Sequence, residues 1–103
     1  MKITDIEQKE IIDGFLGRFI HQNGFTIAFW EITEGASLPE HSHIHEQTTQ
    51  VTEGAFEMTI NGVTKIYKPG MIAIIPSQAI HSGKAITPCK VTDVFSPVRD
   101  DYK

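Results

Sequence analysis

The chain has 103 residues, a net charge of −4 and a pI of about 5.6, which describe one small acidic domain spanning residues 1–103. It has no basic run that would bind nucleic acid and no apolar stretch long enough to cross a membrane. The first ten residues are too polar for a secretory signal. The only cysteine, Cys89, excludes an internal disulfide and fits a reducing compartment, so we expect a cytoplasmic protein.

The N-terminal third contains one clear strand. Thr4–Gly14 has a weak pattern that fits either a helical turn or an edge strand. Phe25–Thr33 is a predicted strand with two apolar faces, formed by Phe25, Ile27 and Phe29 on one side and by Ala28, Trp30 and Ile32 on the other. A strand that is apolar on both faces needs cover on the outside of its sheet. We expect this cover to come from the N-terminal segment or from a second subunit, and we predict a homodimer.

The middle of the chain predicts a hairpin. Gln47–Thr52 and Ala55–Ile60 are predicted strands, and Asn61-Gly62 is typical of the two-residue type I′ turn that returns the chain as Val63–Tyr67. The register pairs Ile60 with Val63, Phe56 with Tyr67 and Met58 with Lys65. The first two pairs predict an inward apolar face, from which Lys65 must extend its amine to solvent.

Two more strands follow, Met71–Ile75 after the Pro69-Gly70 turn and Lys90–Ser96 near the C-terminus. Short strands separated by glycine and proline at regular intervals predict an all-β sandwich or barrel.

Four of the five histidines suggest a metal site. His41, His43 and His45 alternate, Gln47 follows two residues later, and His81 stands alone after an apolar run. Alternation places side chains on one face of an extended strand, and imidazole nitrogens bind Zn, Cu, Fe and Ni. However, four residues on one straight strand span too great a length to meet one ion at bond distances of ~2 Å. A bend must therefore intervene and one of the four must be excluded, but the spacing does not say which.

The same residues resemble the cupin superfamily. Its first pattern is matched by Gly35, five residues, His41-Ser-His43, three residues, Gln47, six residues and Gly54. Its second pattern is matched by Pro69-Gly70, an apolar strand, Pro76 and His81. The two motifs, residues 35–54 and 69–81, imply a single-domain cupin-type double-sheet jelly-roll barrel. The resemblance also implies that His41, His43, Gln47 and His81 bind one divalent transition metal (Zn, Ni, Mn or Fe), and it leaves His45 out.

The chain departs from the superfamily pattern at three positions. Gln47 replaces a glutamate, Met71 replaces an acidic residue and Ala79 replaces a glycine. The first change leaves the ligand set neutral, so that the ion keeps its full charge, and it weakens the parallel with carboxylate-ligated oxygenases.

A narrower resemblance concerns two strings, residues 41–49 and residues 93–102. Both are similar to the small pectin-degradation cupins that linearise unsaturated uronates. Gln50 stands where that group often has tyrosine, so the preferred substrate is open. The resemblance implies a small-molecule sugar acid as substrate and active-site roles for Asp93, Phe95 and Arg99.

The pattern of the last strand leaves two interpretations of Asp93. This residue alternates with Val91 and Phe95 and so points inward, where a carboxylate is costly unless it is paired or functional. A structural pair with Arg99 and a position beside the metal are both possible, and the resemblance favours the second. Arg99 would then bind the uronate carboxylate, Asp93 would move a proton and Phe95 would contact the sugar. We expect Asp100 and Asp101 to belong to a solvated tail.

Three functions compete at this stage. The first is a metal-dependent enzyme that opens unsaturated hexuronates from pectin or alginate to linear keto sugars. The second is a cupin-type metal-dependent oxygenase, which rests on the three-histidine set alone. The third is a non-catalytic carbohydrate-binding cupin.

Overall fold

The computed structural model describes residues 1–103, which form strands and two single-turn 3-10 helices, with no α-helix. The elements are η1 (Ile3–Asp5), β1 (Lys9–Ile12), β2 (Phe15–Gln22), β3 (Phe25–Ile32), β4 (Ser37–His41), β5 (Glu46–Glu53), β6 (Phe56–Ile60), β7 (Val63–Tyr67), β8 (Ile72–Ile75), β9 (His81–Ala85), β10 (Cys89–Ser96) and η2 (Asp100–Tyr102). No helix in the chain has the length and apolar character needed to cross a membrane.

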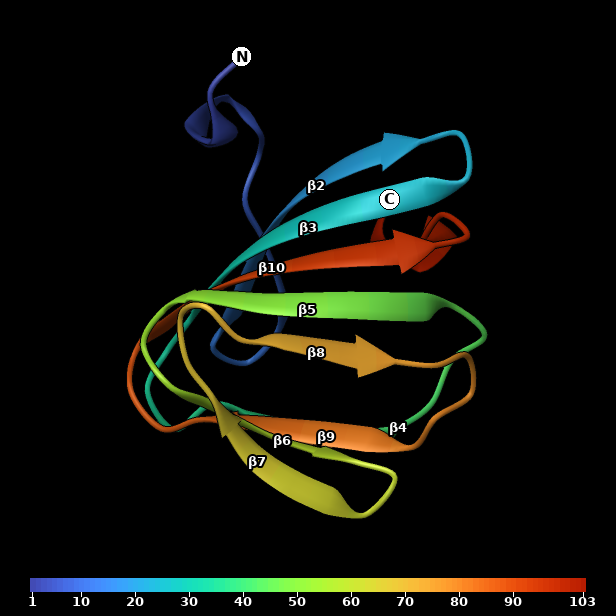
Figure 1. Ribbon diagram of the computed structural model, residues 1–103. Coiled ribbons are helices and arrows are strands. Elements are labelled where there is room, and N and C mark those ends of the chain that lie inside the picture. The colour runs from blue at the N-terminus through green and yellow to red at the C-terminus, as the bar shows by residue number, and fades with distance from the viewer.

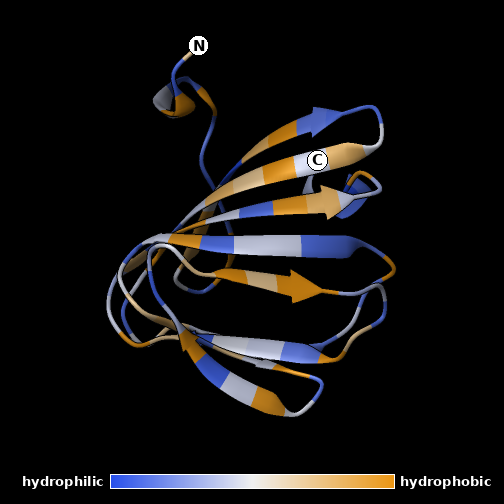
Figure 2. Ribbon diagram, in the orientation of Figure 1, coloured by the Kyte–Doolittle hydropathy of each residue, from blue (hydrophilic) through white to orange (hydrophobic).

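The strands form two antiparallel sheets that face each other (Figure 1). One has six strands in the order β1-β2-β3-β10-β5-β8, and the other has four in the order β4-β9-β6-β7. The predicted all-β, double-sheet jelly roll is therefore confirmed. Hydropathy varies along β7 and β10, whereas β8 is hydrophobic along most of its length and β5 is largely hydrophilic (Figure 2). The core lies between the sheets.

Strand β10 lies in the middle of the larger sheet and sets the position of the site. It pairs along its length with β3 on one side and β5 on the other, so that Asp93 lies opposite both Ala28 and Thr49. Side chains directly opposite one another on neighbouring strands point to the same face. The inward-facing residues of these three strands therefore form one continuous wall of the interior.

Strand β3 shows the expected inner face, and part of the expected outer cover is present. Its residues alternate between buried and more exposed, and Trp30 is only 7% exposed. On the outer face Phe29 is half-buried, and Ile3 and Thr4 line the same surface hollow as Phe29. The N-terminal segment thus supplies some cover, and the homodimer remains a prediction.

The hairpin of β6 and β7 has the register predicted from the Asn61-Gly62 turn: Ile60 pairs with Val63 and Met58 with Lys65. The predicted inward position of Val63 is wrong, since its side chain is 58% exposed. The reason is that β7 is the edge strand of the smaller sheet and pairs only with β6. Lys65 is also exposed and needs no special arrangement.

The N-terminal region contains both of the alternatives considered, a helical turn (η1) and an edge strand (β1). Strands β2, β4 and β9 were not predicted. Strand β2 contains Gly17, which β-propensity disfavours, but the glycine has a packing role. A Cβ atom there would lie 2.8 Å from Cζ3 of Trp30. The absence of a side chain at Gly17 therefore leaves room for the indole of Trp30 next to the backbone of β2.

Candidate metal centre

Three histidines converge at one end of the barrel. His41 ends β4, His81 begins β9 directly opposite it, and His43 lies in the loop after β4. Each offers a ring nitrogen, and these atoms all lie within 4.8 Å of one another. His81 is 1% exposed and the other two are half-buried. The bend expected from the sequence is the loop between β4 and β5, which ends the strict alternation after His41.

The backbone fixes the orientation of all three rings. Each Nδ1 atom lies within hydrogen-bond distance of a carbonyl oxygen: His41 with Pro39 at 2.8 Å, His43 with His45 at 3.0 Å and His81 with Ala79 at 2.9 Å. Because a carbonyl only accepts, a neutral ring must carry its hydrogen on Nδ1 and donate it. The Nε2 atom of each ring is then left with a free lone pair, which is the arrangement a metal ligand requires.

His81 provides a test of whether a cation fits. Its Nε2 atom is fully buried and has no hydrogen-bond partner. Burial, the largest cause, and the neighbouring His41 and His43 together lower the pKa of His81 to about 4. The ring is therefore neutral near pH 7 and directs a desolvated lone pair at the other histidines, which is costly unless a partner is bound. A transition metal ion is a partner of the right chemistry.

Gln47 lies beside this group. It is on β5, is 7% exposed, and its Oε1 atom lies 3.1 Å from Nε2 of His43. With the His43 proton on Nδ1, two lone pairs face each other here, a contact that a cation between them would make favourable. The amide nitrogen of Gln47 donates to Thr49 Oγ1 at 2.9 Å and to Asp93 Oδ1 at 3.2 Å. These bonds determine that the amide oxygen, and not the nitrogen, faces the histidines.

His45 is separate from the metal-ligand group. It does not belong to the three-histidine group, and its ring packs edge-on against His43 and Phe95, with centroids 5.4 and 6.4 Å apart. Its carbonyl accepts the Nδ1 hydrogen bond of His43. His45 therefore supports the site through its backbone, in agreement with the ligand set implied by the family pattern.

Asp93 is held by three donors. This side chain, 7% exposed, accepts hydrogen bonds from Trp30 Nε1 at 2.9 Å, Thr49 Oγ1 at 2.5 Å and Gln47 Nε2 at 3.2 Å. Burial raises the pKa of Asp93, and the three hydrogen bonds oppose this rise. The structure contains no Asp93–Arg99 ion pair, so the structural interpretation of Asp93 from the sequence is not supported: its carboxylate is instead satisfied by neighbours on β3 and β5.

Arg99 is held by a different carboxylate. Its Nε and Nη2 atoms donate to the two oxygens of Asp101 at 3.0 and 2.8 Å. Its guanidinium carbon also lies 4.7 Å from the ring centroid of Phe95 and 4.0 Å from that of Tyr102. The expectation that Asp101 belongs to a solvated tail is wrong, because the turn of η2 brings it back onto Arg99. Asp100 fits the expectation better, since it is 78% exposed and pairs with Lys103.

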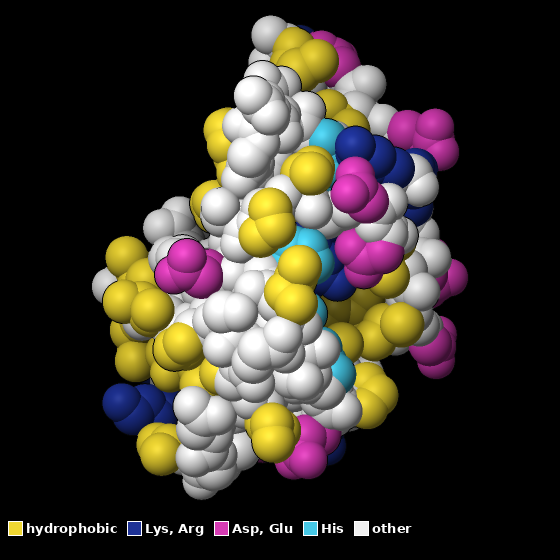
Figure 3. Space-filling view, turned by 90° about the vertical axis from the view of Figure 1, so that its right-hand side faces the viewer, with side chains coloured by type: hydrophobic (Ala, Val, Ile, Leu, Met, Phe, Trp, Pro, Cys, Tyr) yellow, Lys and Arg dark blue, Asp and Glu magenta, His cyan; other side chains and the backbone are white.

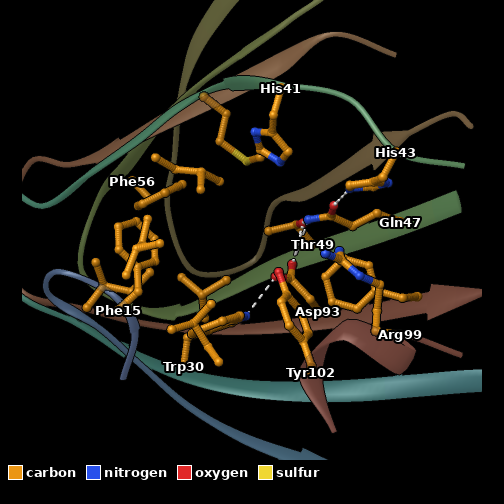
Figure 4. Close-up of a pocket in the computed structure, with 17 residues that line it drawn as sticks. Phe15, Trp30, His41, His43, Gln47, Thr49, Phe56, Asp93, Arg99 and Tyr102 are labelled. Carbon is orange, nitrogen blue, oxygen red and sulfur yellow. Dashed lines mark hydrogen bonds between the residues drawn. The ribbon is translucent and has the colours of Figure 1, made fainter. Parts of the chain in front are cut away.

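Several of these residues, though not His81, His45 or Asp101, line a cavity of about 140 Å³. A single water needs roughly 10–15 Å³ of such space, so the cavity has room for a small organic molecule. Its polar lining is made by His41, His43, Gln47, Thr49, Asp93, Arg99 and Tyr102, and its apolar lining includes Phe15, Phe56 and Met58. Figure 4 shows Phe15 and Phe56 at the opposite side of the cavity from His43 and Arg99. In Figure 3, histidine and basic side chains border a hollow in which hydrophobic side chains are visible.

Sequence reasoning missed four residues of the site: Trp30, Thr49, Tyr102 and Asp101. Trp30 was placed on one of the two apolar faces of a predicted strand, and Thr49 lies two residues after Gln47 on the same strand face. Periodicity therefore contained the signal for these two. Tyr102 lies beyond the last strand, where no period applies, and it joins the site through η2.

Comparison with known proteins identifies the family. The family model described as "Cupin domain" matches residues 28–95, well over half of the chain, and the chain belongs to this family. The structure of KdgF from Halomonas sp. is similar, with 27% identity, a TM-score of 0.91, and coverage of 97% of this chain and 94% of that one. An RmlC-like cupin from Shewanella frigidimarina has 25% identity, a TM-score of 0.94, and coverage of 100% and 94%.

More distant structures share the fold alone. A variant of oxalate decarboxylase from Bacillus subtilis has 16% identity and a TM-score of 0.83, with coverage of 94% of this chain and 29% of that one. No curated protein matches the chain in sequence.

Proposed function

We propose that this cupin is a metal-dependent enzyme that converts 4,5-unsaturated hexuronates from pectin or alginate breakdown to linear keto sugars. The observation that carries the proposal is that one cavity is lined by His41 and His43 of the three-histidine group, by Gln47, and by both Asp93 and Arg99. The resemblance of residues 41–49 and 93–102 to the uronate-linearising cupins supports it, as does the similarity of nearly the whole chain to KdgF.

The metal would be one divalent transition ion, Zn, Ni, Mn or Fe, held by His41, His43, His81 and the amide oxygen of Gln47. These donors are neutral, so a bound ion would keep its full charge and would polarise oxygens of the substrate. The residues fit such an ion because the three Nε2 atoms are free and that of His81 is buried without a partner.

The proposed reaction is an isomerisation that needs no oxidant or reductant. The hydroxyl on C1 loses its proton, C1 becomes a carbonyl carbon, and the bond between C1 and the ring oxygen breaks. The electron pair passes to the ring oxygen, which stays on C5 as an enolate. A proton then adds to C4 and C5 becomes a ketone. Asp93 is the proposed group that takes the first proton and returns one to C4, because it is the cavity's one carboxylate.

Arg99 and Phe95 would bind the substrate. The guanidinium presents donors with the planar geometry that a carboxylate accepts, which a lysine would not reproduce. Phe95 is 2% exposed and lines the same part of the cavity, where its ring would contact the sugar ring. The hydroxyl groups of a sugar must stay on the polar side of the cavity, since Phe15, Phe56 and Met58 offer no hydrogen-bond partners.

The test is an ultraviolet assay on the metal-loaded protein. Unsaturated uronate loses the absorbance of its conjugated double bond on conversion, and the protein should accelerate this loss above the spontaneous rate. Asp93→Ala should abolish the acceleration. A rate equal to the spontaneous one, or full activity of Asp93→Ala, would refute the proposal. We also propose a reducing, cytoplasmic location, in keeping with the free thiol of Cys89.

The alternative favoured by the three-histidine group alone is a metal-dependent oxygenase. Elemental analysis and oxygen uptake discriminate between the two. Bound redox-active iron with oxygen consumption would support the oxygenase, whereas Zn or Ni without oxygen consumption would exclude it. The third possibility, a non-catalytic sugar-binding cupin, predicts sugar in the cavity without turnover.

A further inference from the structure

The side chain of Asp101 contacts Arg99 from outside the cavity. Arg99 lines the cavity and its side chain is only 9% exposed, whereas the side chain of Asp101 is 57% exposed and does not line the cavity. The contact is a two-point one, with Nε and Nη2 of Arg99 each donating to a different oxygen of Asp101. Paired N–H donors that meet both oxygens of a carboxylate fix the plane of the guanidinium as well as its distance.

Other contacts remove most of the remaining freedom of Arg99. The guanidinium carbon lies over the rings of Phe95 and Tyr102. The backbone N–H of Arg99 donates to Thr26 Oγ1 at 2.9 Å, which anchors the residue to β3. Both ends of this long side chain are therefore fixed, and the guanidinium cannot turn without breaking the contact with Asp101.

The donors that remain are on the cavity side. A guanidinium has five N–H donors, and Asp101 uses one on Nε and one on Nη2. One N–H of Nη2 and both N–H groups of Nη1 are left, and these form the end of the group that can bind a second carboxylate with two parallel hydrogen bonds. Figure 4 shows the guanidinium next to Gln47 and Asp93, pointing toward the middle of the cavity.

We propose that Asp101 is a positioning residue, which holds Arg99 so that its Nη1–Nη2 end faces the cavity and makes the site selective for ligands that carry a carboxylate. This inference rests on the carboxylate-binding part of the proposed function, and not on its chemical step. Asp101 would act through Arg99 alone and would not touch the ligand.

A competing role for the same contact predicts the opposite result. If Asp101 merely occupies Arg99 in the absence of a ligand, it competes with the ligand carboxylate. Removing its charge would then leave Arg99 free and would tighten the binding of acids. If Asp101 positions Arg99, removing its charge lets the guanidinium turn and weakens that binding. The direction of the change therefore decides between the two roles.

The experiment measures binding without turnover. Galacturonate has no 4,5 double bond and so cannot react, and galactose differs from it only at C6, where it lacks the carboxylate. Titration calorimetry of the metal-loaded protein with each sugar therefore measures how much the carboxylate contributes to binding affinity. We expect the wild type to prefer galacturonate, and Asp101→Asn to weaken galacturonate binding roughly tenfold with galactose unchanged. Asp100→Asn is the matched control, because it removes the same charge from the next residue, whose partner is the exposed Lys103. Thermal melting of both variants checks that they fold alike.

Three outcomes would overturn the inference: equal galacturonate affinity in the two variants, tighter binding by Asp101→Asn, or no preference of the wild type for the acid. Failure of the proposed function gives a different pattern. In that case the wild type does not convert unsaturated uronate, yet Asp101→Asn still loses the preference for the acid and Asp100→Asn keeps it. This result would support the positioning role of Asp101 and would show that only the proposed chemical step is wrong.

Discussion

Replacing Asp93 by asparagine tests whether the buried carboxylate orients Gln47, the proposed fourth metal ligand. In the structure, Oδ1 of Asp93 accepts from Thr49 and Gln47, while Oδ2 accepts from Trp30. An asparagine has one oxygen and one NH₂ group in place of these two acceptors. One of the two sides must therefore change its hydrogen bonding.

The structure indicates which side changes. The indole N–H of Trp30 can only donate and its ring is packed across Gly17, so the asparagine oxygen should stay on the Trp30 side. The new NH₂ group then faces Gln47, whose amide can turn and accept through its oxygen. That rotation replaces Oε1 by an NH₂ group opposite His43 and removes one of the proposed metal ligands. A buried donor left facing a donor would cost about 1–3 kcal/mol, so the rotation is favoured.

We expect the metal affinity of Asp93→Asn to fall by a factor of about 10–100, as is typical when the partner of a metal ligand is lost. Competition with a chromophoric chelator at neutral pH measures this affinity, and urea unfolding of the metal-free protein checks the fold. Thr49→Val is the control: it removes one donor to Asp93 and one acceptor for the Gln47 amide, but it keeps the carboxylate that accepts from Gln47, and it should lose clearly less affinity. An Asp93→Asn protein that is inactive but binds metal as tightly as the wild type would refute the coupling through Gln47.

Three further predictions concern the whole protein. Adding Zn²⁺ at about 1,000 times its Kd should stabilise the fold by about 4 kcal/mol, and a chelator should reverse this; a melting temperature that does not respond to metal would contradict the assigned site. The pKa of His81 is about 4 in the folded protein and 6.5 in the unfolded one, so the metal-free protein should lose stability as the pH falls from about 6.5 to 4. This group should account for a loss of up to about 3 kcal/mol. Urea unfolding at stepped pH measures the loss, and a stability that does not change over this pH range would disprove it. The exposed Ile72 and Ile74 on β8 add apolar side chains to the outer face of the larger sheet, from which we predict a homodimer. Light scattering at micromolar concentration should give the mass of a dimer, and Ile74→Lys should lower that mass. A monomeric wild type would exclude the predicted dimer.

Local signals in the sequence predicted local structure well. The Asn61-Gly62 turn determined the pairing of β6 with β7 residue by residue, because a two-residue turn leaves one register. The burial of Val63 could not be predicted in the same way, because it depends on whether the opposite sheet extends over β7. Strand β2 was missed because Gly17 has low strand propensity, and its use becomes clear only with Trp30 in place.

The histidines of the candidate metal site were predictable from the sequence, but the residues that hold the neighbouring side chains in place were not. Spacing and the family pattern selected His41, His43 and His81, and the structure brings their nitrogens together. The partner of Arg99 was not predictable, since strand alternation ends at Ser96 and the turn of η2 decides that Asp101 returns to the guanidinium. A sequence pattern gives the direction of a side chain only while the chain keeps a regular period.

The position of the single tryptophan has a practical consequence. Trp30 donates its indole hydrogen to the carboxylate proposed to move the proton, and no other tryptophan is present in the chain. Its fluorescence therefore comes from one place, a side chain in direct contact with Asp93. Metal loading, ligand entry and changes in the charge of that carboxylate all alter the electric field at one indole. The protein thus carries a built-in optical reporter, and fast mixing experiments can follow the order of these events without any added label.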